Sequence, residues 1–137
     1  MTADQNKHLV RTKIALWYEP DRIDQLRTLV ADDYVHHGAN GDLTFDEFAA
    51  QLGYLAAAFS RPSVTIVHVL AEADLVAAFI MYEAVHTGDF AGVPATGRKV
   101  STVGAYHCRI ADGRVQEDWD AWGLLSIVRQ IQAASPA

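Results

Sequence analysis

The segment from Gly113 to Gly123, GRVQEDWDAWG, decides how this chain folds. Its side chains alternate in character, as they do along a β-strand, where successive residues point to opposite faces of a sheet. One alternate set consists of Gln116, Asp118, Asp120 and Trp122. Carboxylates on a sheet face usually contact water, whereas a tryptophan and the apolar runs on both sides of the segment favour burial. Whether this face meets solvent or an internal site therefore decides both the fold and the function.

A hairpin turn directly before this segment sets the expected register of the last two strands. Asp112 and Gly113 match a type I′ turn, which needs positive φ at both of its central residues. The pairs of residues that this turn is expected to place opposite each other are Ala105 with Asp120, His107 with Asp118, and Arg109 with Gln116. One face of the hairpin would then be polar and its reverse mostly apolar.

Two arrangements of this hairpin fit the sequence. The polar face can contact solvent while helices cover the apolar face, or it can line a cavity on the helix side while another subunit covers the apolar face. Polar groups inside a cavity are costly unless they are paired, so in the second arrangement they would serve binding or chemistry. The apolar face is expected to carry Tyr106, Cys108, Ile110, Val115 and Trp119. A register shift of one residue would exchange the two faces, and the alternation leaves both arrangements open.

Amphipathic helices are predicted for the first part of the chain. Apolar residues at helical spacing predict a helix over residues 4–18. Asp21 can cap a second helix, whose buried stripe is expected to run from Ile23 to Val30. Thr44 and Glu47 form a capping box that begins a third helix. Three helices thus precede the strands.

After Pro62 the hydrophobic period changes from that of a helix to that of a strand. The expected strands, separated by short turns, are residues 63–71, 75–87, 99–111 and 114–122. A short helix over residues 124–133 is expected to follow them. Three helices and a long, curved antiparallel meander define an α+β fold in which the helices cover one face of the sheet. A pocket can lie between these two layers.

Length and composition narrow the class of protein. The 137 residues suffice for a single domain over residues 1–137, half of them are apolar, and the formal net charge is −6. The chain has no cluster of Lys and Arg that could follow a phosphate backbone, so no nucleic acid partner is expected. A single cysteine, Cys108, excludes an internal disulfide and fits a reducing compartment. The first residues show neither a signal peptide nor an apolar span, so we expect a cytoplasmic protein with no membrane contact.

Two segments of the chain resemble a known family. Residues 86–100, HTGDFAGVPATGRKV, and residues 109–120, RIADGRVQEDWD, closely resemble the SnoaL-like polyketide cyclases of the nuclear-transport-factor-2-like (NTF2-like) superfamily. Residues 34–37, YVHH, are similar to the Y-V-x-H segment of that family. The resemblance implies a cone-shaped α+β fold with a deep pocket, a homodimer or homotetramer, a hydrophobic small-molecule ligand, and no metal or organic cofactor.

The same resemblance implies a role for Asp120. Characterised members of the family close the last ring of anthracycline precursors by an intramolecular aldol reaction, in which an aspartate of their E-x-W-D segment acts as acid and base. This role carries over to Asp120, which would turn the face of Asp118 and Asp120 towards the pocket. The chain departs from the family at Asp118, where many relatives have histidine, and at Gly123 and Ser126, which replace an aspartate and a glycine. The first departure places a second carboxylate beside Asp120.

These residues define a candidate active site. Asp120 is expected to be the general acid/base, because a partly apolar pocket can tune a carboxylate to remove a proton beside a carbonyl group. His107 is expected to stabilise an enolate oxygen, with a structural His–Asp pair as the alternative. The residues expected to line the pocket and bind the substrate are His36, His86, Asp118, Trp122, Trp17 and Tyr18.

Each of these interpretations has an alternative. Asp120 can be a solvated strand carboxylate, His86 can cap a loop, and Trp17 and Tyr18 can serve core packing. Apart from the adjacent His36 and His37, the six histidines form no motif of metal ligands, so no metal site is expected. The same scaffold hosts non-catalytic binding proteins, isomerases, hydrolases and cofactor-free oxygenases, and the fold alone does not select among them.

Overall fold

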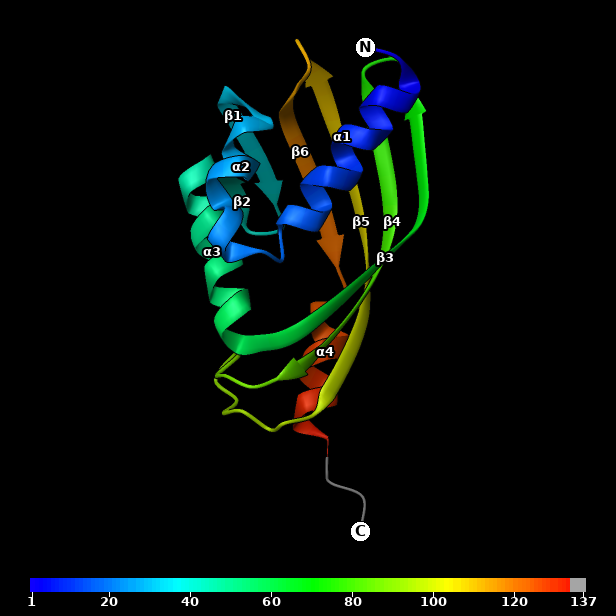
Figure 1. The fold of residues 1–137 in the computed structure, drawn as a ribbon. Helices are drawn as coiled ribbons and strands as arrows, with labels where there is room; N and C mark the ends of the chain where they lie inside the picture. Colours follow the sequence, from blue (N-terminus) through cyan, green and yellow to red (C-terminus); the bar gives the residue numbers. More distant parts are fainter. Residues whose placement is uncertain (134–137) are drawn as a thin grey trace.

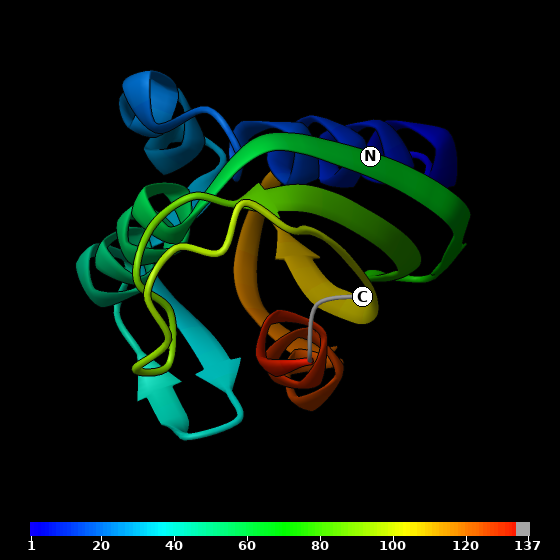
Figure 2. The same ribbon diagram turned by 90° about the horizontal axis from the view of Figure 1, so that it is seen from below.

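A curved six-stranded sheet forms the centre of the protein, and helices pack against it (Figure 1). The computed structural model describes residues 1–133. The strands follow the order β2-β1-β6-β5-β4-β3, and the sheet does not close into a barrel (Figure 2). The strands are β1 (Val30–Gly38), β2 (Gly41–Leu43), β3 (Phe59–Glu72), β4 (Leu75–His86), β5 (Lys99–Ala111) and β6 (Arg114–Trp122). The helices are α1 (Ala3–Leu16), α2 (Ile23–Thr28), α3 (Phe45–Ala58) and α4 (Leu124–Gln132).

The predicted helices are present, and two of them begin as their capping residues require. The Thr44 hydroxyl accepts a hydrogen bond from the Glu47 amide, and the Glu47 side chain accepts one from the Thr44 amide, which confirms the predicted capping box. A second box, formed by Thr2 and Gln5, begins α1. The prediction that Asp21 caps α2 is wrong. This residue lies inside a 3₁₀ turn over Pro20–Arg22, because Pro20 already has the φ of a first helical turn.

The four predicted strands appear as β3 to β6, and two further strands extend the sheet. Val30 had been expected to end the buried stripe of the second helix. It instead begins β1, which follows α2 directly. β1 pairs parallel to β6 and antiparallel to the short β2, which makes the sheet mixed. No helix within residues 1–133 is long and apolar enough to cross a bilayer.

A β-bulge at Gln116 changes the register of the hairpin between β5 and β6. The turn has the predicted form, with φ of 52° at Asp112 and 75° at Gly113, and Val115 lies opposite Ile110 as expected. The next pair is Arg109 with Glu117, so Gln116 is one extra residue in β6. The pairs beyond the bulge are Cys108 with Asp118, His107 with Trp119, Tyr106 with Asp120, and Gly104 with Trp122.

The predicted pairs of His107 with Asp118 and Ala105 with Asp120 are therefore wrong. The bulge turns Asp118 and Asp120 to the helix side of the sheet together with Tyr106, which is buried there. His107 faces the opposite side and is exposed. Each of the two arrangements left open by the sequence is thus half right. The polar residues Asp118 and Asp120 of β6 face the helices, as the second arrangement expected. The apolar residues of β5, such as Tyr106, also face the helices, as the first arrangement expected.

Candidate functional site

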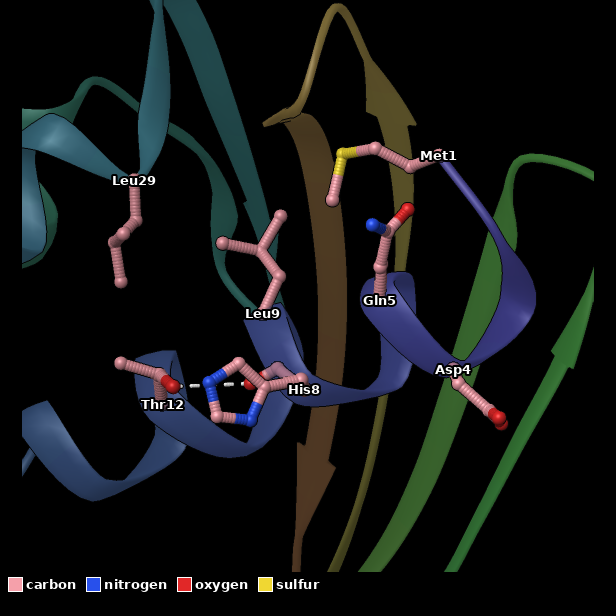
Figure 3. Close-up of a pocket in the computed structure, with 7 residues that line it drawn as sticks. All are labelled: Met1, Asp4, Gln5, His8, Leu9, Thr12 and Leu29. Atoms are coloured by element: carbon pink, nitrogen blue, oxygen red, sulfur yellow. Dashed lines mark hydrogen bonds between the residues drawn. The ribbon is translucent and has the colours of Figure 1, made fainter.

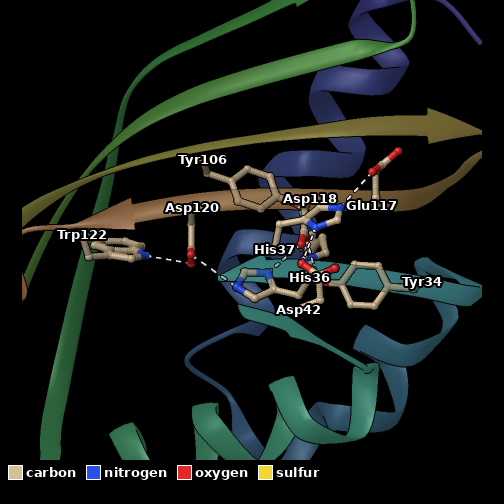
Figure 4. Close-up of polar contacts among 10 residues, drawn as sticks. Tyr34, His36, His37, Asp42, Tyr106, Glu117, Asp118, Asp120 and Trp122 are labelled. Atoms are coloured by element: carbon tan, nitrogen blue, oxygen red, sulfur yellow. Dashed lines mark hydrogen bonds and ion pairs between the residues drawn. The ribbon is translucent and has the colours of Figure 1, made fainter. Parts of the chain in front are cut away.

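Asp118 lies at the centre of a network of buried polar side chains (Figure 4). Its side chain has no exposed surface. It accepts hydrogen bonds from the hydroxyl groups of Tyr34 and Tyr106, both at 2.8 Å, and from Nδ1 of His36 at 2.7 Å. The Nζ atom of Lys13 donates a fourth at 2.9 Å. A carboxylate has about four acceptor positions, so these donors occupy all of them.

Lys13 reaches this network from α1. Its side chain is fully buried, and its ammonium group lies 5.1 to 5.5 Å from the ring centres of four aromatic residues. These are Trp17, Tyr34, Phe48 and Tyr106. The rings supply cation–π attraction, while Asp118 supplies the opposite charge. The cation is therefore compensated although water does not reach it.

His36 connects Asp118 to Asp120. β1 places its ring between the two carboxylates, with Nδ1 2.7 Å from Asp118 Oδ1 and Nε2 3.3 Å from Asp120 Oδ1. The ring packs on Phe48 of α3, at 4.5 Å between centres, and is 1% exposed. The parallel pairing of His36 with Asp118 in adjacent strands sets this geometry. As the family resemblance implied, His36 faces inward, and the next residue, His37, faces outward.

The charges of this network hold two pKa values away from their usual ranges. Burial alone would lower the pKa of His36, but the hydrogen bonds and charges of Asp118 and Asp120 outweigh it and raise the pKa to about 9. Burial alone would raise the pKa of Asp118, but Lys13 and His36 together hold it well below the usual range. At neutral pH the imidazole of His36 is thus positively charged and Asp118 is negatively charged.

Asp120 is the carboxylate of this network that keeps access to solvent. Its side chain is 17% exposed. Oδ1 faces His36, and Oδ2 accepts a hydrogen bond from Nε1 of Trp122 at 3.0 Å (Figure 4). Gly104 makes room for this tryptophan, since a Cβ atom there would lie 2.3 Å from the Trp122 ring. Two N–H groups therefore fix the orientation of Asp120.

Aromatic side chains surround the inner end of this network. Trp17 packs against Tyr106, with 5.0 Å between ring centres, and against Trp122 at 6.4 Å. Tyr18 stacks on Tyr82 at 5.3 Å. The indole nitrogen of Trp17 is buried and has no hydrogen-bond partner among residues 1–133. The sequence-predicted Trp17, Tyr18 and Trp122 are thus brought together with Asp120 and Asp118.

Two of the predicted site residues lie elsewhere. His107 is on the outer face, where its ring stacks on Trp119 at 4.6 Å between centres, so it cannot reach a substrate held by Asp120. The bulge at Gln116 is the physical reason. His86 is buried in a second apolar cluster, beside Phe59, and its Nδ1 contacts the Thr96 hydroxyl at 2.9 Å. Within residues 1–133, no described contact joins it to the Asp118 network.

Three members of the network were not predicted, namely Lys13, Tyr34 and Tyr106. Lys13 carried a usable signal, because it follows Leu9 by four residues and precedes Trp17 by four, which places it on the buried stripe of α1. Tyr106 had been assigned to the outer face. Tyr34 belonged to the quoted Y-V-x-H segment, but nothing in the sequence connected it to Asp118.

A surface hollow lies away from this network. It has a volume of about 560 Å³ and is lined mainly by the first helix (Figure 3). The lining residues are Met1, Asp4, Gln5, His8, Leu9, Thr12 and Leu29. No group of three or more His, Cys, Asp or Glu residues within 1–133 is arranged to hold a metal ion. A substrate pocket beside Asp120 stays a prediction.

A family model places the chain among known proteins. The model of the SnoaL-like polyketide cyclases matches residues 7–131, and the chain belongs to this family. The resemblance recognised from the sequence is thereby confirmed. A comparison with curated protein sequences gives no match.

Solved structures share this fold. AclR, a candidate hydroxylase from Streptomyces galilaeus, is 25% identical, with a TM-score of 0.87 over 98% of this chain and 100% of AclR. A candidate SnoaL-like polyketide cyclase from a Jannaschia species is 23% identical, with a TM-score of 0.88 over 97% and 95% of the two chains. A Catenulispora acidiphila protein with a ketosteroid isomerase-like fold is 21% identical, with a TM-score of 0.73 over 93% and 97%. These similarities confirm the expected NTF2-like α+β fold.

Proposed function

We propose that this protein is an acid/base catalyst of the polyketide cyclase type, which acts without a cofactor on a hydrophobic compound that carries carbonyl groups. The setting of Asp120 supports this proposal most. Its carboxylate lies on the inner face of the sheet, is partly exposed, and is oriented by two N–H groups beside aromatic side chains. A carboxylate held in this way keeps free lone pairs with which it can take a proton from a substrate.

The proposed reaction is an intramolecular aldol closure in which Asp120 acts twice. It takes a proton from the carbon beside one carbonyl group, and the electrons of the broken C–H bond form an enolate. The enolate carbon then attacks a second carbonyl carbon of the same molecule and forms the new C–C bond. The oxygen of that second carbonyl becomes an alkoxide, which takes the proton back from Asp120.

The enolate oxygen needs a hydrogen-bond donor on the inner face, because His107 lies outside. The indole N–H of Trp17 is suited to this part, since it is buried and unpartnered among residues 1–133. Buried donors normally have partners, so a substrate oxygen would complete the hydrogen bonding of Trp17. His36 and Asp118 would hold Asp120 in place without contacting the reacting atoms.

Replacement of Asp120 by asparagine tests this function. Asp120→Asn keeps the shape of the side chain and removes its basicity, so turnover of an aromatic diketone able to close a ring should fall at least ~10²-fold. Binding of the same compound, measured by titration calorimetry, should change little. The control is Asp46→Asn, which alters an exposed carboxylate. Normal turnover by Asp120→Asn, or loss of activity on chelation, would overturn the proposal. Binding without any turnover by the unmodified protein would indicate a binding protein.

The similarity to AclR favours one second candidate, a cofactor-independent hydroxylation. Molecular oxygen would then be the oxidant. It would add to the carbon of an enolate formed by Asp120 and give a hydroperoxide, and loss of water from this hydroperoxide would leave one oxygen atom on that carbon as a new carbonyl group, whose enol form carries the hydroxyl group. The two reactions differ in the product, because aldol closure adds no atom to the substrate, whereas hydroxylation adds one oxygen atom. Mass spectrometry of a reaction run under ¹⁸O₂ separates them.

We also propose that the protein is a homodimer or a homotetramer whose subunits meet through the outer face of the sheet. The apolar set expected on that face has to be corrected, since Tyr106 and Val115 are buried on the inner side. The outer face instead exposes Phe79, Met81 and Val103, each by 40% or more. Contiguous apolar patches of this kind often mark subunit contacts.

A further inference from the structure

Four ionisable side chains form one continuous row of contacts in the interior. Lys13 contacts Asp118 at 2.9 Å, Asp118 contacts His36 at 2.7 Å, and His36 contacts Asp120 at 3.3 Å. Three of these side chains are at most 1% exposed. Two of the four are basic and two are acidic, and they alternate along the row. With all four charged, the row is neutral.

The contacts of His36 with two carboxylates favour its charged form. An ionised carboxylate only accepts hydrogen bonds, so Nδ1 of His36 must carry a proton to bond Asp118. Nε2 faces Asp120, and it too must carry a proton if Asp120 is ionised. Only the imidazolium has both protons. The geometry thus fits a charged His36 between two ionised carboxylates.

Without Lys13, the other three groups would carry one uncompensated negative charge. A buried net charge is costly, and such a group usually neutralises by binding or releasing a proton. Asp118 would still accept hydrogen bonds from Tyr34, His36 and Tyr106, so Asp120 is the carboxylate with more free lone pairs for an added proton. A protonated Asp120 could not act as a base.

We propose that Lys13 is a positioning residue that balances the charge of Asp118, so that His36 stays charged while Asp120 stays unprotonated. The charge balance follows from the contacts of the resting protein, and its benefit for catalysis rests on the proposed function of Asp120. Stability alone is a poor reason for this arrangement, because apolar residues can replace a buried ion pair at little or no loss. The lysine therefore serves Asp120 through Asp118 and His36, without contact to a substrate.

The other titratable groups that face the row do not disturb this balance. They are Tyr34 on β1, Tyr106 and Cys108 on β5, and Tyr18 after α1. Burial raises the pKa of each of them, that of Cys108 to about 11, so all four are neutral at pH 7. From α3, the ring of Phe48 contacts His36 and Lys13, and it does not titrate.

Titration by nuclear magnetic resonance of the substrate-free protein tests the proposal. The imidazole nitrogens report the protonation of His36. In Lys13→Met, the row gains a net negative charge, so the midpoint of His36 should rise by on the order of one unit. In Asp118→Asn, the row gains a net positive charge, so the midpoint of His36 should fall by on the order of one unit or more. The control Lys99→Met removes an exposed lysine, paired with Glu83 at 3.4 Å, and should leave the midpoint of His36 unchanged.

The double variant Lys13→Met/Asp118→Asn separates charge balance from packing. It restores a neutral row, so its His36 midpoint should lie above that of Asp118→Asn, whereas a purely structural role of Lys13 predicts no recovery. Unchanged midpoints in Lys13→Met and Asp118→Asn would overturn the proposal. If the single variants fail to fold, folding of the double variant supports it, and failure of all three contradicts it. Retained turnover by Asp120→Asn would instead refute the proposed function, while these titrations would still judge the charge balance.

Discussion

The charge on His36 couples the candidate site to the pH dependence of folding. Its pKa is about 9 in the folded protein and 6.5 in the absence of its partners. A raised folded-state pKa gives stability that is fully present below pH 6.5 and is lost as the pH rises through 9. The free energy of unfolding should therefore decrease between these two values, by an amount on the order of a few kcal/mol. Urea unfolding at a series of pH values measures this decrease.

The variant His36→Gln should flatten this part of the pH profile, because glutamine does not titrate. The pKa of His37 is also raised, by Asp42 and Glu117, but this residue is a quarter exposed and its ion pairs are screened. The matched control is His68→Gln, which removes an exposed histidine of β3. A profile that keeps its full slope in His36→Gln would show that another group titrates in this window.

Single residues show how far prediction from sequence reached. The family resemblance implied a role for Asp120 from its place in the E-x-W-D segment, and this role stays a prediction. The structure brings Asp120 together with His36 and Trp122, which had been expected to lie near it. Lys13 was visible on the apolar stripe of α1, but a lysine there usually extends its charged end to water. Its partner lies 105 residues away in the sequence, and local patterns do not reveal such a distance.

At the scale of elements, the contact between β5 and β6 depends on a residue without a side chain. Gly104 lies opposite Trp122, and a Cβ atom at this position would overlap the tryptophan ring. We expect Gly104→Ala to lower the free energy of unfolding by about 1–3 kcal/mol, the usual cost of overpacking. It should also move the Trp122 indole away from Asp120, which the nuclear magnetic resonance shift of the indole N–H reports.

Gly53→Ala is the matched control for this substitution. Gly53 lies in α3, and an added Cβ atom would meet no atom within 4 Å. Alanine favours a helix over glycine, so this variant should be more stable by roughly 0.5–1 kcal/mol. The two glycine substitutions should thus act in opposite directions. An unchanged stability of Gly104→Ala would mean that the tryptophan ring has room to move.

The elements also explain why the register prediction failed. The turn at Asp112 and Gly113 was correctly predicted, because its backbone conformation favours particular residues. The bulge at Gln116 has no such local signature. The side chain of this residue donates a hydrogen bond to Asp33 at 2.7 Å, and β6 also pairs with β1 on that side. Contacts with a distant strand therefore accompany the bulge, and a hairpin considered alone does not contain them.

At the scale of the whole molecule, the change of hydrophobic period after Pro62 predicted the fold class. Helices precede the long strands, and the sheet is curved as expected. β1 was not among the expected strands, because only residues 34–37 had been noted, for their family resemblance, and its parallel pairing to β6 is a long-range contact. This strand carries Tyr34 and His36 into the interior, so the site could not be assembled correctly before the topology was known.

The outer face of the same sheet leads to a prediction about assembly. Met81 lies opposite Val103 in the register of β4 and β5, and Phe79 is on the same face. We expect the double variant Met81→Lys/Val103→Glu to be a monomer at concentrations at which the unmodified protein forms dimers or tetramers. The two new side chains have opposite charges and lie side by side across the strands, so they should preserve the fold of the subunit while they make the interface polar.

Sedimentation equilibrium at micromolar concentration measures this change. The control is Leu125→Lys, since Leu125 is 62% exposed but belongs to α4 and lies outside the sheet. If burial of the outer sheet face drives assembly, the control should keep the oligomeric state of the unmodified protein, because the apolar area removed from water there is unchanged. A monomeric unmodified protein would contradict the prediction, and so would an equal loss of assembly in the control. In either case exposed apolar residues on the sheet would not be a subunit contact.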